Sequence, residues 1–512
     1  MISWIEILCT CLISSILIIS KTAHRYLSYI IIGLCGFETI SGLLQNISIC
    51  RSNSSLYSIT GSFHNPGPYG GFLSICICLI EAQYIKLKYY SNSFKDYYRK
   101  TLLVILIASV IVLPATQSRS AILGLVSGLI LLVFRTDGIK VKLKKTVSKY
   151  WLLILLGLVI IVLGLYMFKK PSADGRLFMD KICMETMFRN GLKGVGIGKF
   201  GGAYGRTQHD YFKRQMDNNG MDDLDWTALN QHDRLTADCP DNAFNEYLFV
   251  GVELGALAML VLIAVLLSCI VISFKRGTIW CYGITAFVVF AFFSYPLHLW
   301  QFQVLLPMLL SASISDRINS SKRPVILFLT IIPVIIAIYT IIIFPRIKQS
   351  NQAKEVWKQT ERWYQMEYYE YVVEDCDTLL PYMKHDRYYL FAYGQSLNII
   401  GNYSKSDSIL SLGTKISSDP MFWNVMGNNS LAQGKYREAE ERYKHAFYMV
   451  PNRLYPLYLL AKLYHTEGDT VKFLDMADKV ETFIPKVESV NTERLRNEIR
   501  ELKSGYISEQ YE

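Results

Sequence analysis

Apolar residues along this chain gather in blocks that are long enough to cross a membrane as helices. A helix needs about 20 apolar residues to span a hydrocarbon core about 30 Å thick. Ten blocks are expected to do so: 2–20, 27–45, 69–87, 101–116, 119–134, 150–168, 247–273, 279–298, 299–315 and 325–345. Because two blocks are short and two are divided only by a short corner, 9 to 12 spans fit the pattern. The sequence therefore predicts an all-α, polytopic helical membrane protein.

Two long polar stretches stand apart from these blocks. Residues 169–242 lie between the sixth and seventh spans, and a loop of this length is usually functional rather than a simple connector. From about residue 350 the composition changes to that of a soluble helical domain rich in tyrosine and charge. The expected domains are spans 1 to 6 (1–168), a large loop (169–242), spans 7 to 10 (243–345) and a helical tail (350–512).

The composition excludes an ordinary soluble protein, because 51% of the residues are hydrophobic and only 19% are charged. The net charge of +10 comes from lysines and arginines that cluster in alternate loops, near 21–25, 86–100, 135–149, 275–276 and 317–323. Such an arrangement is the positive-inside pattern of membrane proteins. These charges set topology and predict no nucleic-acid partner. The loop and the tail are expected on the opposite, outer side.

The tail contains an internal repeat that is typical of tetratricopeptide units. One unit has the expected residues at the expected offsets: Trp423, Gly427, Gly434, Tyr436, Ala439, Tyr443, Ala446 and Pro451. The register continues with Leu457, Ala461, Gly468, Ala477 and Pro485, and a weaker earlier unit has Gly394, Gly401 and Tyr403. A stack of such units presents a concave surface to a partner protein. Packing of the stack against the outer face of the membrane domain is the equally weighted alternative.

Polar residues that need a reason to lie beside a membrane begin with two outward-facing turns. His64 and Asn65 lie in a turn rich in glycine and proline, just before a helix N-terminus, where anions are favoured. Arg119 lies between two spans that almost touch. An arginine so close to hydrocarbon is costly and normally has a partner or a function, although snorkelling to lipid phosphate is the alternative.

Two further polar elements flank the large loop. Asp174 and Arg176 open it, and the helix of the seventh span begins just after it closes. In that helix Glu246 and Glu253 fall on one face; capping of the helix start is the alternative role for them. The glycine run 194–198 lacks the preceding strand and the lysine-serine ending of a phosphate-binding loop, so it predicts a tight turn.

The order of these motifs resembles the O-antigen ligase and polymerase superfamily, which includes the protein O-oligosaccharyltransferases. The resemblance covers about 60–315 and is carried by Asn65-Pro66, Ser118-Arg119-Ser120-Ala121, Gly175-Arg176, Gly194-Val195-Gly196-Ile197-Gly198 with Phe200, Asn245-Glu246-Tyr247-Leu248, and Glu253-Leu254-Gly255. It implies transfer of a glycan from undecaprenyl pyrophosphate at the periplasmic face of the bacterial inner membrane. The acceptor would be lipid A core, another glycan or a protein hydroxyl, and neither metal nor cofactor would be needed.

The resemblance also implies roles for individual residues. Arg119 and Arg176 match the arginines that hold the pyrophosphate, a task suited to the bidentate, permanently charged guanidinium. His64, Asn65 and Asn245 are the other expected substrate-binding residues. The family histidine is replaced by Phe244, which cannot take a proton. The candidates for the base are therefore, in order, Glu246, Asp241, His232 and His64.

Three readings of function remain open at this stage. The first is a lipid-linked glycan transferase, either a ligase or oligosaccharyltransferase or, alternatively, an O-antigen polymerase. The second is a polysaccharide transporter that uses Glu38 and Glu81, although no paired broken helices support it. The third is a membrane scaffold in which only the repeat tail is active; it predicts that loss of Arg119 costs nothing.

Overall fold

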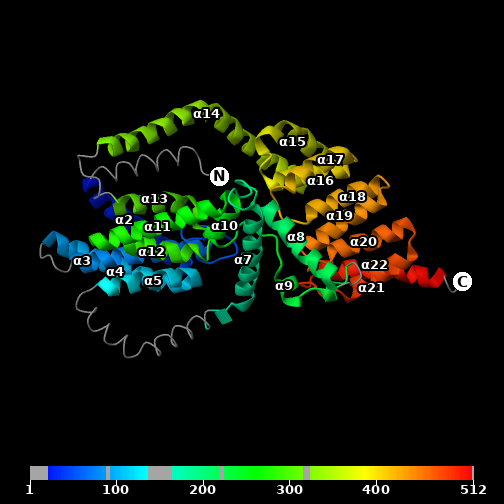
Figure 1. Cartoon of the computed structure of the whole chain (residues 1–512), viewed down its shortest axis with the longest axis horizontal. Coiled ribbons are helices and arrows are strands. Elements are labelled where there is room, and N and C mark those ends of the chain that lie inside the picture. The colour runs from blue at the N-terminus through cyan, green and yellow to red at the C-terminus, as the bar shows by residue number, and fades with distance from the viewer. Residues whose placement is uncertain are drawn as a thin grey trace. The chain divides into compact units, whose positions relative to one another are not determined.

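The computed structural model describes residues 21–87, 93–135, 164–219 except 165 and 168, 224–314 and 323–509. Within these ranges every regular element is a helix, which confirms the all-α class (Figure 1). The chain divides into two compact units. The membrane unit comprises 1–169, 244–247 and 258–343, and the loop–tail unit comprises 170–243, 248–257 and 344–512.

The membrane unit is built from apolar helices. They are α2 (Lys21–Asn46), α3 (Pro66–Leu87), α4 (Ser93–Ala115), α5 (Arg119–Arg135), α11 (Ala256–Arg276), α12 (Trp280–Ala291), α13 (Trp300–Ile314) and the first part of α14 (Arg323–Gln365). Among the described residues, four stretches are long and apolar enough to cross a membrane: Tyr26–Asn46, Pro66–Leu87, Asp96–Ala115 and Ala256–Arg276. Helices α12 and α13 are shorter apolar helices. The expected spans 2–20 and most of 150–168 lie outside the described residues.

The expected seventh span, 247–273, is wrong as a single helix. The chain forms α10 (Glu246–Leu254), breaks at Gly255 and resumes as α11. Gly255 has φ +93°, a backbone conformation that residues with a side chain rarely adopt. A Cβ at this position would also overlap the backbone of Leu192. The apolar pattern runs through the break, so hydropathy alone could not find it.

Small residues let the core helices of the membrane unit approach closely. A Cβ on Gly124 of α5 would lie 2.8 Å from the carbonyl oxygen of Ala286 in α12. Gly71 of α3 likewise lies against the ring of Phe290. Close backbone approach at glycine is a general way to pack helices within membranes. It brings α3, α5 and α12 together as the centre of this unit.

The loop–tail unit joins two segments that are far apart in the sequence. Its helices are α7 (Lys170–Asn190), α8 (Phe200–Asn219), η1 (Trp226–Ala228), α9 (Gln231–Thr236), α15 (Tyr369–Met383), α16 (Arg387–Ile399), α17 (Tyr403–Gly413), α18 (Met421–Ala432), α19 (Tyr436–Met449), α20 (Tyr455–Glu467), α21 (Thr470–Thr482) and α22 (Val490–Glu509). Helix α8 of the loop packs against α19 of the tail. The tail thus folds onto the large loop, an arrangement that neither sequence-based alternative named.

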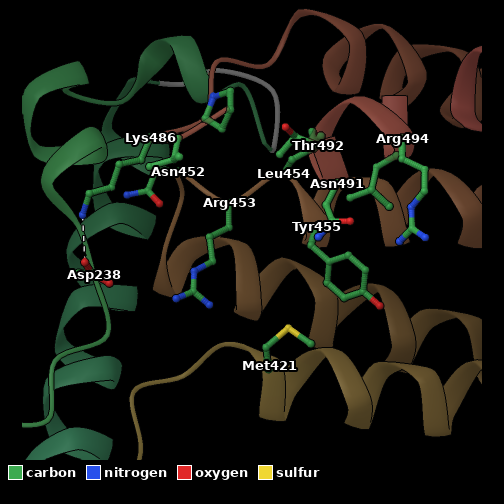
Figure 2. A pocket seen from close by; sticks show the side chains of 13 residues that line it. Asp238, Met421, Asn452, Arg453, Leu454, Tyr455, Lys486, Asn491, Thr492 and Arg494 are labelled. Carbon is green, nitrogen blue, oxygen red and sulfur yellow. Dashed lines mark hydrogen bonds and ion pairs between the residues drawn. The ribbon is translucent and has the colours of Figure 1, made fainter. Parts of the chain in front are cut away.

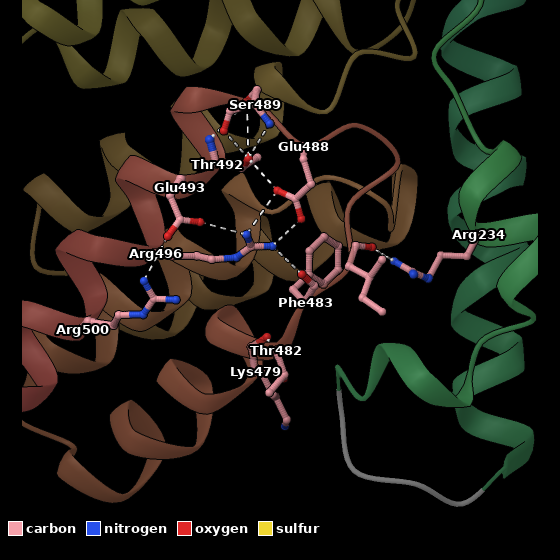
Figure 3. A network of polar contacts seen from close by, with 11 residues as sticks. Arg234, Lys479, Thr482, Phe483, Glu488, Ser489, Thr492, Glu493, Arg496 and Arg500 are labelled. Carbon is pink, nitrogen blue, oxygen red and sulfur yellow. Dashed lines mark hydrogen bonds and ion pairs between the residues drawn. The ribbon is translucent and has the colours of Figure 1, made fainter.

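Polar contacts hold the loop and the tail together. The Arg234 side chain is fully buried between the rings of Trp226 and Phe483, and its guanidinium donates to the carbonyl oxygen of Ile484 at 2.9 Å (Figure 3). Burial lowers the pKa of this guanidinium. In return, the Asn452 amide donates to the carbonyl oxygens of Arg234 and Ala237 at 2.9 and 2.7 Å. These bonds satisfy buried carbonyls that would otherwise be costly.

The end of the tail is fixed by a second arginine. Arg496 of α22 donates to the carbonyl oxygen of Phe483 at 2.7 Å and pairs with Glu488 at 2.9 Å and Glu493 at 3.2 Å (Figure 3). Charge-assisted bonds of this kind are stronger than neutral ones. Arg496 therefore fastens α22 to the same turn after α21 that receives Arg234.

The predicted repeat units correspond to successive helix pairs, α16–α17, α18–α19 and α20–α21. Gly394 and Gly427 lie against Leu410 and Tyr443 of the paired helices, so the absence of a side chain at these positions allows the close approach. Gly401, Gly434 and Gly468 all have positive φ in the turns between the paired helices. The assignment to the tetratricopeptide class stays a prediction.

Candidate functional site

The start of α10 forms a polar corner in the membrane unit together with the chain between α12 and α13. Tyr247 donates its hydroxyl to the carbonyl oxygen of Val288 at 2.9 Å. The ring of Phe244 meets the ring of Tyr295 edge to face, with 5.2 Å between centroids. Asn245 is buried at the foot of the helix. We call residues 244–247 and 295–298 the α10 corner.

Glu246 is the carboxylate of this corner, and it is only 2% exposed. Its Oε2 accepts a hydrogen bond from the backbone N–H of Leu297 at 3.0 Å. Its Oε1 lies 3.8 Å from Nδ1 of His298, at the end of the short 3-10 helix η2 (Pro296–His298). The first candidate base thus faces a histidine that the motifs did not include.

The turn before α3 and the turn before α5 adjoin one another. The Asn65 side chain accepts from the N–H of Gly67 at 2.8 Å and thereby caps α3, which begins with Pro66. The hydroxyl of Ser118 donates to the carbonyl oxygen of Gly67 at 3.3 Å. Arg119 follows as the first residue of α5 and is half-buried. His64 is exposed, with Nδ1 3.1 Å from the carbonyl oxygen of Asn53.

Aromatic packing links these turns to the segment that carries His298. Phe302, near the start of α13, contacts Phe63 of the first turn with 6.0 Å between ring centroids. It also stacks on Phe290 of α12 at 5.7 Å. The membrane unit therefore gathers the Asn65 turn, the Arg119 turn and the α10 corner at one end of its core helices. Arg176 belongs to the other unit.

Glu38, proposed above as a transport carboxylate, supports one of these turns instead. Its carboxylate accepts from the N–H of Ser62 at 3.0 Å and from the hydroxyl of the same residue. Gln45 lies about two turns further along α2. Its side-chain oxygen accepts hydrogen bonds from the backbone N–H groups of Thr60 and Gly61, each at 2.8 Å. Both side chains anchor the Asn65 turn, so Glu38 has a structural role.

The glycine run is a tight turn, as the sequence predicts, with positive φ at Gly194, Gly196 and Gly198. Glu253 holds this turn: its Oε1 accepts from the N–H groups of Gly198 and Phe200 at 2.8 and 3.3 Å. A carboxylate at this position caps the N-terminus of α8 and complements its dipole. Glu246 and Glu253 therefore have different partners, and the structural alternative is the better description of Glu253.

The remaining candidates lie in the loop–tail unit. Arg176 is half-buried within α7, rather than in an irregular loop. His232 is mostly exposed, and its Nε2 lies 3.4 Å from Asp174. Asp241 is exposed and forms a bidentate ion pair with Arg387 of the tail. Burial raises the pKa of Asp241 although Arg387 opposes this shift. Both oxygens of the carboxylate are engaged by Arg387, so the pair connects the loop to the tail.

Two other histidines stack within the loop–tail unit. The rings of His209 in α8 and His445 in α19 lie 3.9 Å apart. Burial lowers the pKa of both imidazoles, that of His445 to about 3. They therefore stay neutral at physiological pH and serve as packing between the two helices.

The loop–tail unit also contains an open pocket of about 580 Å³. Asp238 lines it from the loop, where it pairs with Lys486 at 2.9 Å, and the other walls come from the starts of α18, α20 and α22 (Figure 2). The lining includes the cations Arg453, Lys486 and Arg494 and the ring of Tyr455. Three cations against one carboxylate favour an anionic ligand.

The fold and the site define an integral membrane protein whose polar residues gather beside the ends of apolar helices. Residues 103–263, which run from α4 into α11, match the family model described as O-Antigen ligase. No curated protein matches the chain at a significant level. The family match over part of the chain supports the resemblance to the O-antigen ligase family that the motifs indicate. The match supports a glycosyltransferase-type membrane protein of the O-antigen ligase and polymerase kind.

His298 is the residue that motif-based reasoning missed. It lies beyond the matched segment and 54 positions after Phe244 (298 − 244), so no local pattern relates the two. The available signal was its place in the short corner between two apolar blocks, where a histidine is unusual. Only the packing of residues 244–247 against residues 295–298 brings His298 close to Glu246.

Proposed function

We propose that this protein transfers a glycan from undecaprenyl pyrophosphate to an acceptor hydroxyl at the periplasmic face of the inner membrane. It acts as an O-antigen ligase or protein O-oligosaccharyltransferase, and polymerase activity is the alternative. The observation that carries the proposal is the family match over 103–263, which contains both arginines and the α10 motif. Neither metal nor cofactor takes part.

The two arginines and the substrate-binding candidates have distinct places in this mechanism. Arg119 and Arg176 bind the pyrophosphate through bidentate hydrogen bonds. They stabilise the negative charge that develops when the glycan leaves, which is the main electrostatic task of the site. His64, Asn65 and Asn245 contact the substrates. A base near the α10 corner takes the proton of the acceptor hydroxyl.

Deletion of the gene tests this function and separates its forms. Lipopolysaccharide, lipid-linked glycan and glycoproteins are compared between the deletion strain and the parent. Accumulated long lipid-linked glycan indicates a ligase, chains of a single repeat indicate a polymerase, and unglycosylated acceptor proteins indicate protein transfer. Unchanged profiles in all three would refute the proposal.

The tail pocket is the proposed contact for the acceptor, and its cations favour an acceptor with acidic groups. Arg494 is exposed in the pocket wall, and among the described residues its guanidinium forms no hydrogen bond or ion pair. Replacing Arg494 by alanine is expected to raise the KM for the acceptor about fivefold with kcat unchanged, because only ground-state binding is lost. Steady-state kinetics on the acceptor identified by the deletion measure this. Arg437→Ala, an almost fully exposed arginine of α19 outside the pocket, is the matched control; an equal effect of both variants would contradict the assignment.

A further inference from the structure

The family position for the catalytic base is occupied by Phe244, and the α10 corner contains one histidine. We infer that His298 takes the proton of the acceptor hydroxyl and that Glu246 is the positioning residue that orients it. This inference rests on the proposed function and replaces the sequence-based assignment of Glu246 as the base.

The side chains of Glu246 and His298 face each other in the α10 corner. Oε1 of Glu246 lies 3.8 Å from Nδ1 of His298. This distance is within ion-pair range but longer than a hydrogen bond. A carboxylate that closes onto Nδ1 fixes the tautomer, so that the other nitrogen, Nε2, carries the lone pair. Contacts of this kind are often long in the absence of substrate and tighten when it binds. The pair therefore has the arrangement of a base with its orienting group.

Glu246 is buried more deeply than His298. Glu246 is 2% exposed, and its other oxygen already accepts from Leu297 N–H, so a bulky acceptor cannot reach it easily. The His298 side chain is 32% exposed. Of the two groups, the imidazole is therefore the one that can meet an acceptor hydroxyl.

His298 lies close to Phe244, the position at which the family has its histidine. The rings of Phe244 and His298 both contact Tyr295, with centroid separations of 5.2 and 6.2 Å. An imidazole at 298 therefore lies in the neighbourhood that the family histidine, at position 244, would occupy. In this chain the imidazole of the α10 corner comes from residue 298 instead of residue 244.

The reaction step balances without any other reactant. Nε2 of His298 accepts the proton as the acceptor oxygen forms a bond to the anomeric carbon of the glycan. The bond from this carbon to the lipid pyrophosphate oxygen breaks, and its electron pair leaves with the pyrophosphate. The proton then passes from the imidazolium to solvent or to the departing pyrophosphate, and the imidazole is regenerated.

The decisive experiment restores the family histidine. His298→Ala is expected to reduce transfer about 100-fold, the usual contribution of a general base. Phe244→His in the same chain is expected to recover at least a tenth of the wild-type rate. Residue 244 has φ +47°, and histidine tolerates this left-handed conformation better than most residues. Added imidazole is a second, independent rescue of His298→Ala.

Glu246→Gln tests the positioning role. Its amide oxygen can still accept from Leu297 N–H, so the corner is preserved while the carboxylate charge is lost. Transfer is expected to fall about tenfold in the wild-type background and to be unaffected in His298→Ala, because Glu246 acts through the imidazole. Equal losses in both backgrounds would assign Glu246 a role of its own.

The assay uses the full-length chain in the deletion strain, with protein levels measured in the membrane. His385→Ala, an exposed histidine of the tail, is the control and should retain activity. If His298→Ala does not accumulate, His298→Asn with and without Phe244→His replaces it. Full activity of the His298 variants, or inactivity of well-accumulated variants that neither rescue restores, would overturn the inference. A wild-type gene that restores no transfer would instead refute the proposed function.

Discussion

Replacing Arg119 by alanine is expected to reduce glycan transfer about 1,000-fold, the scale of losing one preorganised group that stabilises transition-state charge. Arg119 opens α5 beside the Ser118–Gly67 contact, and the same end of the membrane unit carries the α10 corner. A guanidinium there offers two parallel hydrogen bonds to a pyrophosphate. Transfer is measured as glycan-modified acceptor formed in the deletion strain complemented with each variant.

Two controls sharpen this expectation. Arg119→Lys keeps the charge but loses the bidentate geometry, so an intermediate loss is expected. Arg99→Ala removes an arginine of α4 whose partner among the described residues is Asp96 in a surface ion pair, and it should retain activity. Full activity of Arg119→Ala at normal protein levels would favour the scaffold interpretation, in which loss of Arg119 does not reduce activity.

Replacing Gly202 by alanine is expected to lower the free energy of unfolding of the loop–tail unit by about 3 kcal/mol. A Cβ on this residue of α8 would overlap the backbone carbonyl of Lys415. A Cβ on the neighbouring Gly201 would likewise lie only 2.6 Å from the carbonyl oxygen of Ile416. Backbone cannot rotate aside as a side chain can, so α8 must move away from the tail. Thermal unfolding and protease resistance of the purified full-length protein measure the loss.

Gly505→Ala is the matched control for this prediction. Gly505 lies in α22 of the same unit, and a Cβ there meets nothing within 4 Å. Alanine favours helix over glycine by about 1 kcal/mol, so this variant should be neutral or slightly stabilised. If Gly202→Ala behaved like Gly505→Ala, α8 would not pack on the tail as described.

The helix pairs of the tail and the tight glycine turn could be predicted because their signals are local. Gly427 and Tyr443 lie on the two helices of one pair, α18 and α19, which are adjacent in the sequence. The positive φ of Gly194 follows from a glycine run in a loop. Contacts between distant segments could not be predicted. The break at Gly255 depends on the approach of Leu192, and the burial of Arg234 depends on Phe483 and Ile484.

The sequence by itself determined the all-helical membrane class and indicated the family, because apolar blocks and motif order are one-dimensional properties of the chain. The tertiary structure decided what each polar group touches. It gave Glu253 to a helix cap, Asp241 to an ion pair and Glu246 to His298. Pairings of this kind depend on which turns the packed helices bring together, and no spacing along the chain encodes them. The residue proposed as the base is therefore the one that only the fold brings to the motif.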